Sequence, residues 1–555
     1  MGQTRRQFVG TAVAAGAALG VGVVGVRAAI APGPARLALD AFVSDPKRLE
    51  SLRRGVAVMK SRLPSDHKSW FFQGAIHAYS DALYQDALAR DAKLSKVDSN
   101  RYWNRCPHFG QASADFVIWH RAYLHYFERV LRDAASDPDL ALPYWNYALP
   151  ADRVFPDVFG VKFVDSQRTR TNPLYHPNRE LAFVSGRLEL SGAIGEAHAA
   201  HDAANFFHEP GVPGLAGDHL GPEETQIGLL EQRPHNDIHL AVGGVVNSVN
   251  GAMAEITTAA FDPVFWVHHA NIDRMWAEWM RNPGKRWGTM PPDDWWNEKP
   301  WVFLDVDGTE QSMSRRDYLE LESPYDTISG APSLQLPPRP QPVVTSSAPV
   351  RRGTRAEPPP SGAAAEAAPP PAPPPPPKKA APQQRQLISD AGAVSLTPQT
   401  AAKRSVLASV ASATVGAVAG GSANRDELES APRGGSLAAP QLGSPGARVF
   451  LELSGIRFDR VPSSGFAVFL DRSNGKAQQP VGLLDLFGAT HAQMPGMAMH
   501  GAAQRFDVTR VVKSGAGPFT LRIEPYDLLV TRAGNAASQR RDAVHIDSVK
   551  FVVVS

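Results

Sequence analysis

A run of proline and alanine in the middle of the chain limits what the whole sequence can fold into. Residues 357–382 read EPPPSGAAAEAAPPPAPPPPPKKAAP. Proline restricts its own backbone and donates no amide hydrogen bond, so neither a helix nor a sheet can continue through this run. We therefore predict an extended linker over residues 330–446. At 555 residues, the chain is long enough for a domain with its own core on each side.

The segments on the two sides of the linker differ in their hydrophobic pattern. Residues 36–329 are rich in tryptophan, phenylalanine and histidine. Within them, apolar side chains recur three and four positions apart over 70–91 and 114–135, which predicts helices. Residues 447–555 instead alternate apolar and polar side chains in runs such as VFLELS and FTLRIE. We predict a mainly α domain followed by a small antiparallel β-sandwich domain.

The first 31 residues have the layout of an export signal. A pair of arginines, Arg5 and Arg6, precedes an apolar run rich in alanine and glycine that ends at Ala29-Ile30-Ala31. This layout predicts a twin-arginine signal peptide and a mature protein that is periplasmic or secreted. We expect no stable membrane span after cleavage; an uncleaved anchor is the alternative, but the run is barely long enough to span. A net charge of +2 argues against nucleic acid as a partner.

The histidines fall into groups that suggest a metal site. His235 and His239 are four residues apart, which on a helix places both imidazoles on one face. Other histidines lie in apolar, aromatic-rich segments, where a buried imidazole is expected to be neutral and hydrogen-bonded or metal-bound: His77, His108, His120, His268 and His269. Adjacent helical residues point about 100° apart, so one of the last two is expected to bind metal and the other to support it. Ligation by imidazoles alone favours copper or zinc over magnesium or calcium.

Three of these segments resemble the copper-binding regions of the tyrosinases, catechol oxidases and haemocyanins, the type-3 dicopper proteins. They read HRAYLHYFER, PHNDIHLAVGG and DPVFWVHHANIDRMW, and the resemblance extends from about residue 70 to 325. It implies a four-helix bundle that holds two copper ions. It also implies the ligands: His77, His108 and His120 for copper A, and His235, His239 and His269 for copper B. His268 is then a supporting residue.

The copper A region departs from the family pattern at two points. Eleven residues separate His108 from His120, more than is usual in the family, which indicates a small insertion. The only cysteine, Cys106, precedes His108 by two residues. This C-x-H arrangement is similar to that of fungal tyrosinases and molluscan haemocyanins, and it implies a thioether bond between Cys106 and His108. The alternative is a small buried free thiol.

The resemblance implies a phenol oxidase that uses O2 to hydroxylate monophenols at the ortho position and to oxidise o-diphenols to o-quinones. Hydroxylation requires that the phenol lose its proton. Glu231, four residues before His235, and Asn236, directly after it, match a pair that holds a water molecule as base in family members. The alternatives are a helix N-terminal charge for Glu231 and an exposed helical position for Asn236.

Further residues near the ligands match pocket and support positions of the family. Ile256 takes the place of a bulky aromatic residue over copper A in plant enzymes, and Leu240 is the other expected pocket wall. Asp273 is expected to orient an imidazole or to pair with Arg121, which follows His120.

The C-terminal domain resembles the extension that covers the active site of latent tyrosinases, which implies a zymogen. Its segment His491–His500, HAQMPGMAMH, offers thioether and imidazole groups that suit Cu(I). The alternative for this segment is an adaptable packing surface. A copper-delivery partner is a further candidate partner beside phenols and O2. The competing functions are a catechol oxidase without monophenol activity, a haemocyanin-like oxygen carrier and a zinc hydrolase.

Overall fold

The computed structural model describes residues 33–107, 113–219, 226–335, 385–390, 394–396, 447–472, 480–487, 489, 503–513, 519–532 and 543–554. The predicted signal peptide, most of the predicted linker, His108 and the segment His491–His500 lie outside the described residues. Among the helices of the described part, none has the length and apolar character needed to cross a membrane.

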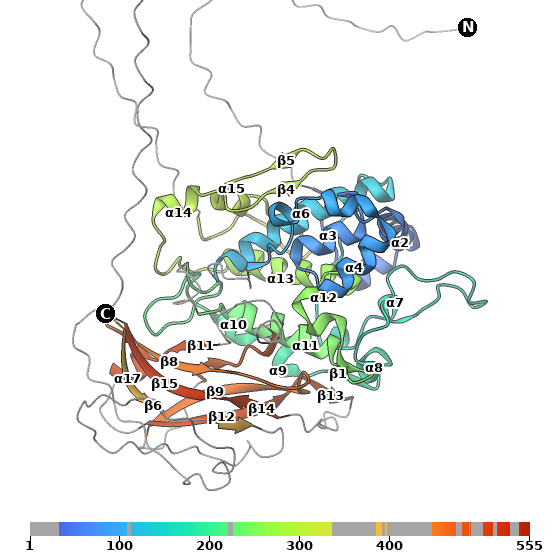
Figure 1. Cartoon of the computed structure of the whole chain (residues 1–555). Coiled ribbons are helices and arrows are strands. Elements are labelled where there is room, and N and C mark those ends of the chain that lie inside the picture. Colours follow the sequence, from blue (N-terminus) through green and yellow to red (C-terminus); the bar gives the residue numbers. More distant parts are fainter. Residues whose placement is uncertain are drawn as a thin grey trace, which may run out of the picture.

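The helical domain is built around four helices that pack against one another (Figure 1). Helices α2 and α13 both contact α6, and α3 contacts α2. The bounds of these helices are α2 (Pro46–Ser61), α3 (Trp70–His77), α6 (Asp115–Ala135) and α13 (Pro263–Arg281). The start of α13 follows local chemistry, because the Asp262 side chain accepts a hydrogen bond from the Val264 amide and proline occupies the first turn.

Further helical elements surround these four helices. They are α1 (Leu39–Val43), α4 (Asp81–Arg90), η1 (Ala92–Lys96), α5 (Ser99–Tyr102), η3 (Pro150–Arg153), α7 (Asp157–Gly160), α8 (Leu181–Val184), α9 (Gly192–Gly195), α10 (His198–Asp202), η4 (Glu231–Asn236), α11 (Asp237–Gly243), η5 (Ala252–Ala254), α12 (Ile256–Ala259), α14 (Asp293–Asn297) and α15 (Arg315–Leu319). Helices α9, α10 and α11 lie on the side that faces the strands in Figure 1.

The helix predicted over residues 114–135 is confirmed by α6, but the single helix predicted over 70–91 is wrong. The chain forms α3 and α4 there, with an interruption between His77 and Asp81. The reason is local: Ala78 has an extended backbone, and the Ser80 side chain caps the second helix by accepting a hydrogen bond from the Leu83 amide. Apolar spacing alone did not reveal this cap.

The C-terminal domain consists of short antiparallel strands, as predicted. One sheet has the order β11-β8-β15-β6 and the other β10-β9-β12. Phe519 of β12 and Phe551 of β15 meet edge to face with ring centroids 6.3 Å apart, so the two sheets share a core. The strands are β6 (Arg385–Asp390), β7 (Val394–Leu396), β8 (Arg448–Ser454), β9 (Ser464–Arg472), β10 (Gly482–Leu483), β11 (Gln504–Asp507), β12 (Phe519–Asp527), β13 (Leu529–Thr531), β14 (Val544–Ile546) and β15 (Ser548–Val554), with the helix α17 (Thr509–Lys513).

Two strands lie inside the range that was predicted as linker. Strand β6 pairs with β15, and β7 pairs with β14, so residues 385–390 and 394–396 differ from the prediction of an extended linker over 330–446. Strand formation depends on the partner that the fold offers more than on local composition, and here the partner edges come from the C-terminal end of the chain. Residues 330–335 also join the helical domain, since the Leu334 amide donates to the Met280 carbonyl at 3.0 Å.

The helical domain has two small hairpins of its own, and a further strand pair joins it to the C-terminal domain. Strands β2 (Val245–Val246) and β3 (Val249–Asn250) form a hairpin, as do β4 (Phe303–Leu304) and β5 (Glu310–Gln311). Strand β1 (Leu188–Leu190) instead pairs antiparallel with β13 of the C-terminal domain. This pairing holds the β domain against the face of the helical domain that carries α11.

Candidate metal centre

The structure brings most of the predicted ligands together in two buried groups. Among the described residues, one group contains His235, His239, His268 and His269, and the other contains His77, Cys106 and His120. In each group, the potential ligand atoms all lie within 4.8 Å of one another. The groups adjoin, because the rings of His120 and His269 stack with centroids 4.2 Å apart and an interplanar angle of 13°.

The helices explain how these rings meet. His120 is on α6 and His268 and His269 are on α13, and these two helices pack against each other. His235 and His239 are four residues apart but are not on one regular helix, since His235 ends the π-helical element η4 and His239 is on α11. Their ring centroids are nevertheless 4.5 Å apart. The two imidazoles therefore lie close together, as predicted, although an irregular turn and not one regular helix brings them there.

Four of the imidazoles are oriented in the same way by a hydrogen bond from Nδ1. In each case the acceptor is a carbonyl oxygen, so Nδ1 carries the proton and Nε2 carries the lone pair that can bind a metal. The donor and acceptor pairs are His77 with the Ile256 carbonyl at 3.1 Å, His120 with the Phe116 carbonyl at 2.8 Å, His239 with the Met253 carbonyl at 2.8 Å, and His235 with the Asn236 side-chain oxygen at 2.8 Å.

The adjacent histidines of α13 differ in their contacts. His268 Nδ1 lies 3.2 Å from the Tyr147 hydroxyl, whereas neither ring nitrogen of His269 has a hydrogen-bond partner among the described residues. Burial holds the pKa of both imidazoles well below its usual value, so both rings are neutral. A neutral, fully buried imidazole without a hydrogen bond is costly unless a metal takes its lone pair. The two histidine groups therefore fit a pair of copper ions.

The predicted copper A region is only partly described. Cys106 is buried and forms no disulfide in the described structure, and its Sγ lies 4.0 Å from His120 Nε2. His108 lies outside the described residues, so its ligand role and its thioether bond with Cys106 stay predictions.

Both residues of the predicted water-holding pair are buried, and Asn236 contacts the imidazole of His235. Glu231 and Asn236 are each 3 % exposed, which rules out the exposed helical position considered for Asn236. The Ser113 hydroxyl donates to Glu231 Oε2 at 3.4 Å. The amide of Asn236 accepts from His235 and donates to Asp485 Oδ1 at 3.0 Å. Asn236 therefore links a predicted ligand to a residue of the C-terminal domain.

Asp273 forms an ion-pair network with guanidinium groups and a tyrosine hydroxyl. Its Oδ1 accepts from Arg121 Nε at 2.6 Å, and its Oδ2 accepts from Arg36 at 3.0 Å and from the Tyr325 hydroxyl at 2.6 Å. Burial raises the pKa of Asp273, but the two guanidinium groups together outweigh it and lower the pKa below its usual value. The predicted pair with Arg121 is confirmed, and it ties α6 to α13 directly beside His120.

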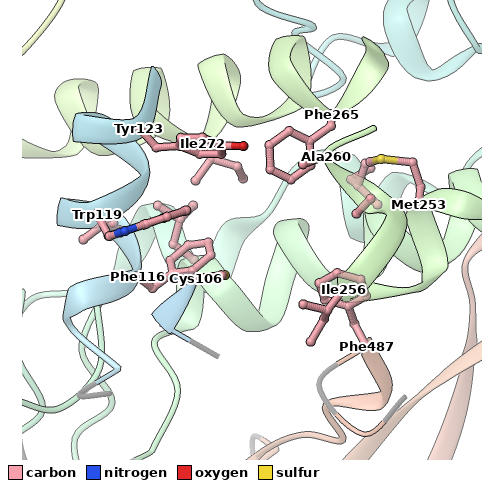
Figure 2. Packing of buried hydrophobic residues seen from close by; sticks show 14 of the residues in the cluster. Cys106, Phe116, Trp119, Tyr123, Met253, Ile256, Ala260, Phe265, Ile272 and Phe487 are labelled. Carbon is pink, nitrogen blue, oxygen red and sulfur yellow. The ribbon is translucent and has the colours of Figure 1, made fainter. Parts of the chain in front are cut away.

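The C-terminal domain contributes an aromatic side chain that sequence analysis missed. The fully buried ring of Phe487 stacks on His239, with centroids 4.1 Å apart and an interplanar angle of 18°. Figure 2 shows this ring next to Ile256, on a ribbon of the C-terminal domain that reaches the helical domain. Leu240 is also buried, at 3 % exposure. A single phenylalanine in an apolar stretch gives no sequence signal for such a role.

The fold and the site define a helical protein with two adjoining histidine groups suited to copper. Residues 67–282 match the family model described as the common central domain of tyrosinase. The chain is 34% identical over 284 residues to a tyrosinase of Hahella sp. (strain CCB-MM4), covering 48% of this chain and 57% of that protein. It is 30% identical over 302 residues to the chloroplastic (+)-larreatricin hydroxylase of Larrea tridentata, covering 52% and 48%.

The match thus spans about half the length of these curated relatives. Among solved structures, latent apple tyrosinase has a TM-score of 0.47 at 18% identity and covers 95% of this chain and 98% of that one. Residues 67–282 therefore match the central domain of the tyrosinase family, a family whose cofactor is a pair of copper ions, and the two histidine groups of this chain could hold metal ions.

Proposed function

We propose that this chain is a type-3 copper phenol oxidase that uses O2 to hydroxylate monophenols and to oxidise o-diphenols to o-quinones. The observation that carries the proposal is the pair of adjoining, buried histidine groups. His77, His108 and His120 would hold one copper ion, and His235, His239 and His269 the other. Copper bound there would supply the two-electron chemistry with O2, and the protein supplies geometry and access.

The position of Phe487 indicates where the ring of the substrate would bind. An aromatic ring already stacks on His239 there, so a phenol ring of similar size would fit the same space once Phe487 withdraws. Ile256 and Leu240 would form aliphatic walls beside it. His268, whose Nδ1 contacts the Tyr147 hydroxyl, would support the neighbouring ligand imidazoles without binding copper itself.

Glu231 and Asn236 would activate the monophenol. A phenol with a pKa near 10 must lose its proton before it can bind a metal well, and a positioned water molecule can accept that proton. Both side chains are buried, Asn236 accepts a hydrogen bond from the His235 imidazole, and the Ser113 hydroxyl donates to the carboxylate of Glu231. This arrangement supports monophenol hydroxylation beside diphenol oxidation.

The contacts of the C-terminal domain support a latent form. Phe487 occupies the space over His239, Asp485 engages Asn236, and β13 pairs with β1. The proposed zymogen would be exported by the twin-arginine route and activated when this domain is released.

Oxygen consumption and absorbance, followed with a paired monophenol and catechol before and after limited proteolysis, test this function. We expect copper-loaded protein to oxidise both substrates, with a higher rate after proteolysis. Oxidation of the catechol alone would restrict the function to a catechol oxidase. Reversible O2 binding without turnover of either substrate would favour an oxygen carrier and overturn the proposal.

A further inference from the structure

The C-terminal domain reaches a predicted copper ligand through a continuous chain of hydrogen bonds. His235 Nδ1 donates to Asn236 Oδ1 at 2.8 Å, and Asn236 Nδ2 donates to Asp485 Oδ1 at 3.0 Å. The amide orientation is determined by its neighbours. Rotating it by 180° would place its oxygen against the carboxylate and would remove the acceptor for the imidazole N–H. The direction of the chain, from imidazole to amide to carboxylate, is therefore fixed.

The backbone that carries Asp485 is held at several successive positions. The Asp485 amide donates to Gln504 Oε1 at 2.9 Å, and Gln504 Nε2 donates back to the Asp485 carbonyl at 2.7 Å. The Leu484 amide donates to the Phe466 carbonyl at 2.9 Å. The Leu483 amide donates to Gln232 Oε1 of the helical domain at 3.1 Å. This turn therefore presents the Asp485 carboxylate to Asn236 in one position.

We propose that Asp485 is a positioning residue for the imidazole of His235, and that the C-terminal domain thereby strengthens copper retention while it covers the site. The inference rests on the proposed copper centre. A carboxylate at the end of the chain polarises the amide, which makes the imidazole a better donor and restricts rotation of its ring. Partners of this kind typically change metal affinity by about 10- to 100-fold.

This role differs from that of Phe487, whose apolar ring stacks on His239 and occupies the space over it. The same role of Asp485 also links copper retention to activation of the proposed latent enzyme. In the covered form, the Asn236 amide donates its hydrogen bond to the Asp485 carboxylate. Release of the domain frees the same amide to orient the water molecule of the proposed reaction.

The test is an equilibrium competition for Cu(I) between the full-length protein and a chromophoric chelator, under anaerobic, reducing conditions. We expect Asp485→Asn to weaken the binding of one of the two ions by about 10-fold, because a neutral acceptor is weaker than a charged one, and Asp485→Ala to weaken it further. The matched control is Asp471→Asn on β9 of the same domain, whose carboxylate pairs with Arg522 at 2.6 Å. This control should keep the wild-type affinity for both ions.

A double-mutant comparison locates the effect. If the influence of Asp485 passes through Asn236, adding Asp485→Asn to Asn236→Ala should cause no further loss of affinity. Wild-type affinity in Asp485→Asn, or a fully additive loss in the double variant, would overturn the inference. Because Asn has nearly the same shape as Asp, this variant decides the test even if Asp485→Ala detaches the domain. No phenol is present, so failure to oxidise phenols would contradict the proposed function and leave this result intact.

Discussion

Substitution of Phe487 by alanine should activate the full-length protein without proteolysis. The ring is fully buried and stacks on His239. Burial of an aromatic side chain is worth about 2 kcal/mol and a favourable ring pair adds about 1 kcal/mol, so the covered state should lose about 3 kcal/mol. Since 1.4 kcal/mol corresponds to a factor of ten, the uncovered fraction should rise by about 100-fold while the covered state still predominates.

The assay is the initial rate of catechol oxidation by copper-loaded, unproteolysed protein, measured by oxygen consumption. The matched control is Phe469→Ala, the same substitution on β9, where the half-buried ring lies under the Arg522 guanidinium at 3.9 Å and has no ring contact with a histidine among the described residues. The control should stay as latent as the wild type. Equal activation by both variants would mean that general weakening of the β domain is sufficient. A Phe487→Ala protein as inactive as the wild type would refute a covering role for this ring.

Other predictions concern the base, the acid stability and the thiol. Glu231→Gln should reduce monophenol hydroxylation at least about 10-fold more than diphenol oxidation, as paired initial rates would reveal; equal losses would argue against a base. Burial and Arg448 lower the pKa of His208 to about 4, so the metal-free protein should lose stability on the order of 3 kcal/mol from pH 6.5 down to 4. Denaturant unfolding should show a flatter pH dependence for His208→Asn, and an unchanged profile would contradict this. In copper-loaded protein, Cys106 should resist alkylation and remain linked to His108 in peptide mass spectra, whereas a separately modified Cys106 would exclude the thioether.

The sign of the acid effect follows from the direction of the shift. The buried imidazole of His208 resists protonation in the folded protein, whereas the unfolded chain binds a proton near pH 6.5. The stabilisation is therefore complete above about pH 6.5 and is lost as the pH falls towards the folded-state value. The geometry agrees, because His208 Nδ1 accepts the Gly214 amide hydrogen bond at 3.0 Å and cannot do so once protonated.

Sequence patterns predicted the parts of this protein that depend on local spacing. The helix α6 and the strands β8 and β12 follow from apolar periodicity, and His235 and His239 were paired because they are four residues apart. Even so, the pattern gave no hint that an irregular π-helical turn, rather than one helix, brings this pair together.

Contacts between distant segments could not be predicted in the same way. Asp485 is 249 residues from Asn236 along the chain, and no sequence motif around either residue predicts contact with the other. The strand β6 depends on the edge of β15, which local composition does not reveal. The covering role of a C-terminal domain was expected from resemblance, but Phe487 could be identified only from its stacking on His239.

The most direct test of the account combines copper content with oxygen consumption in one preparation. Full-length protein loaded with copper and then proteolysed between the two domains should contain two copper ions per chain and should consume O2 when catechol is added. Protein without copper should consume none. A proteolysed protein that binds two copper ions but consumes no O2 with any monophenol or catechol would contradict the central claim that these histidine groups form a phenol-oxidising centre.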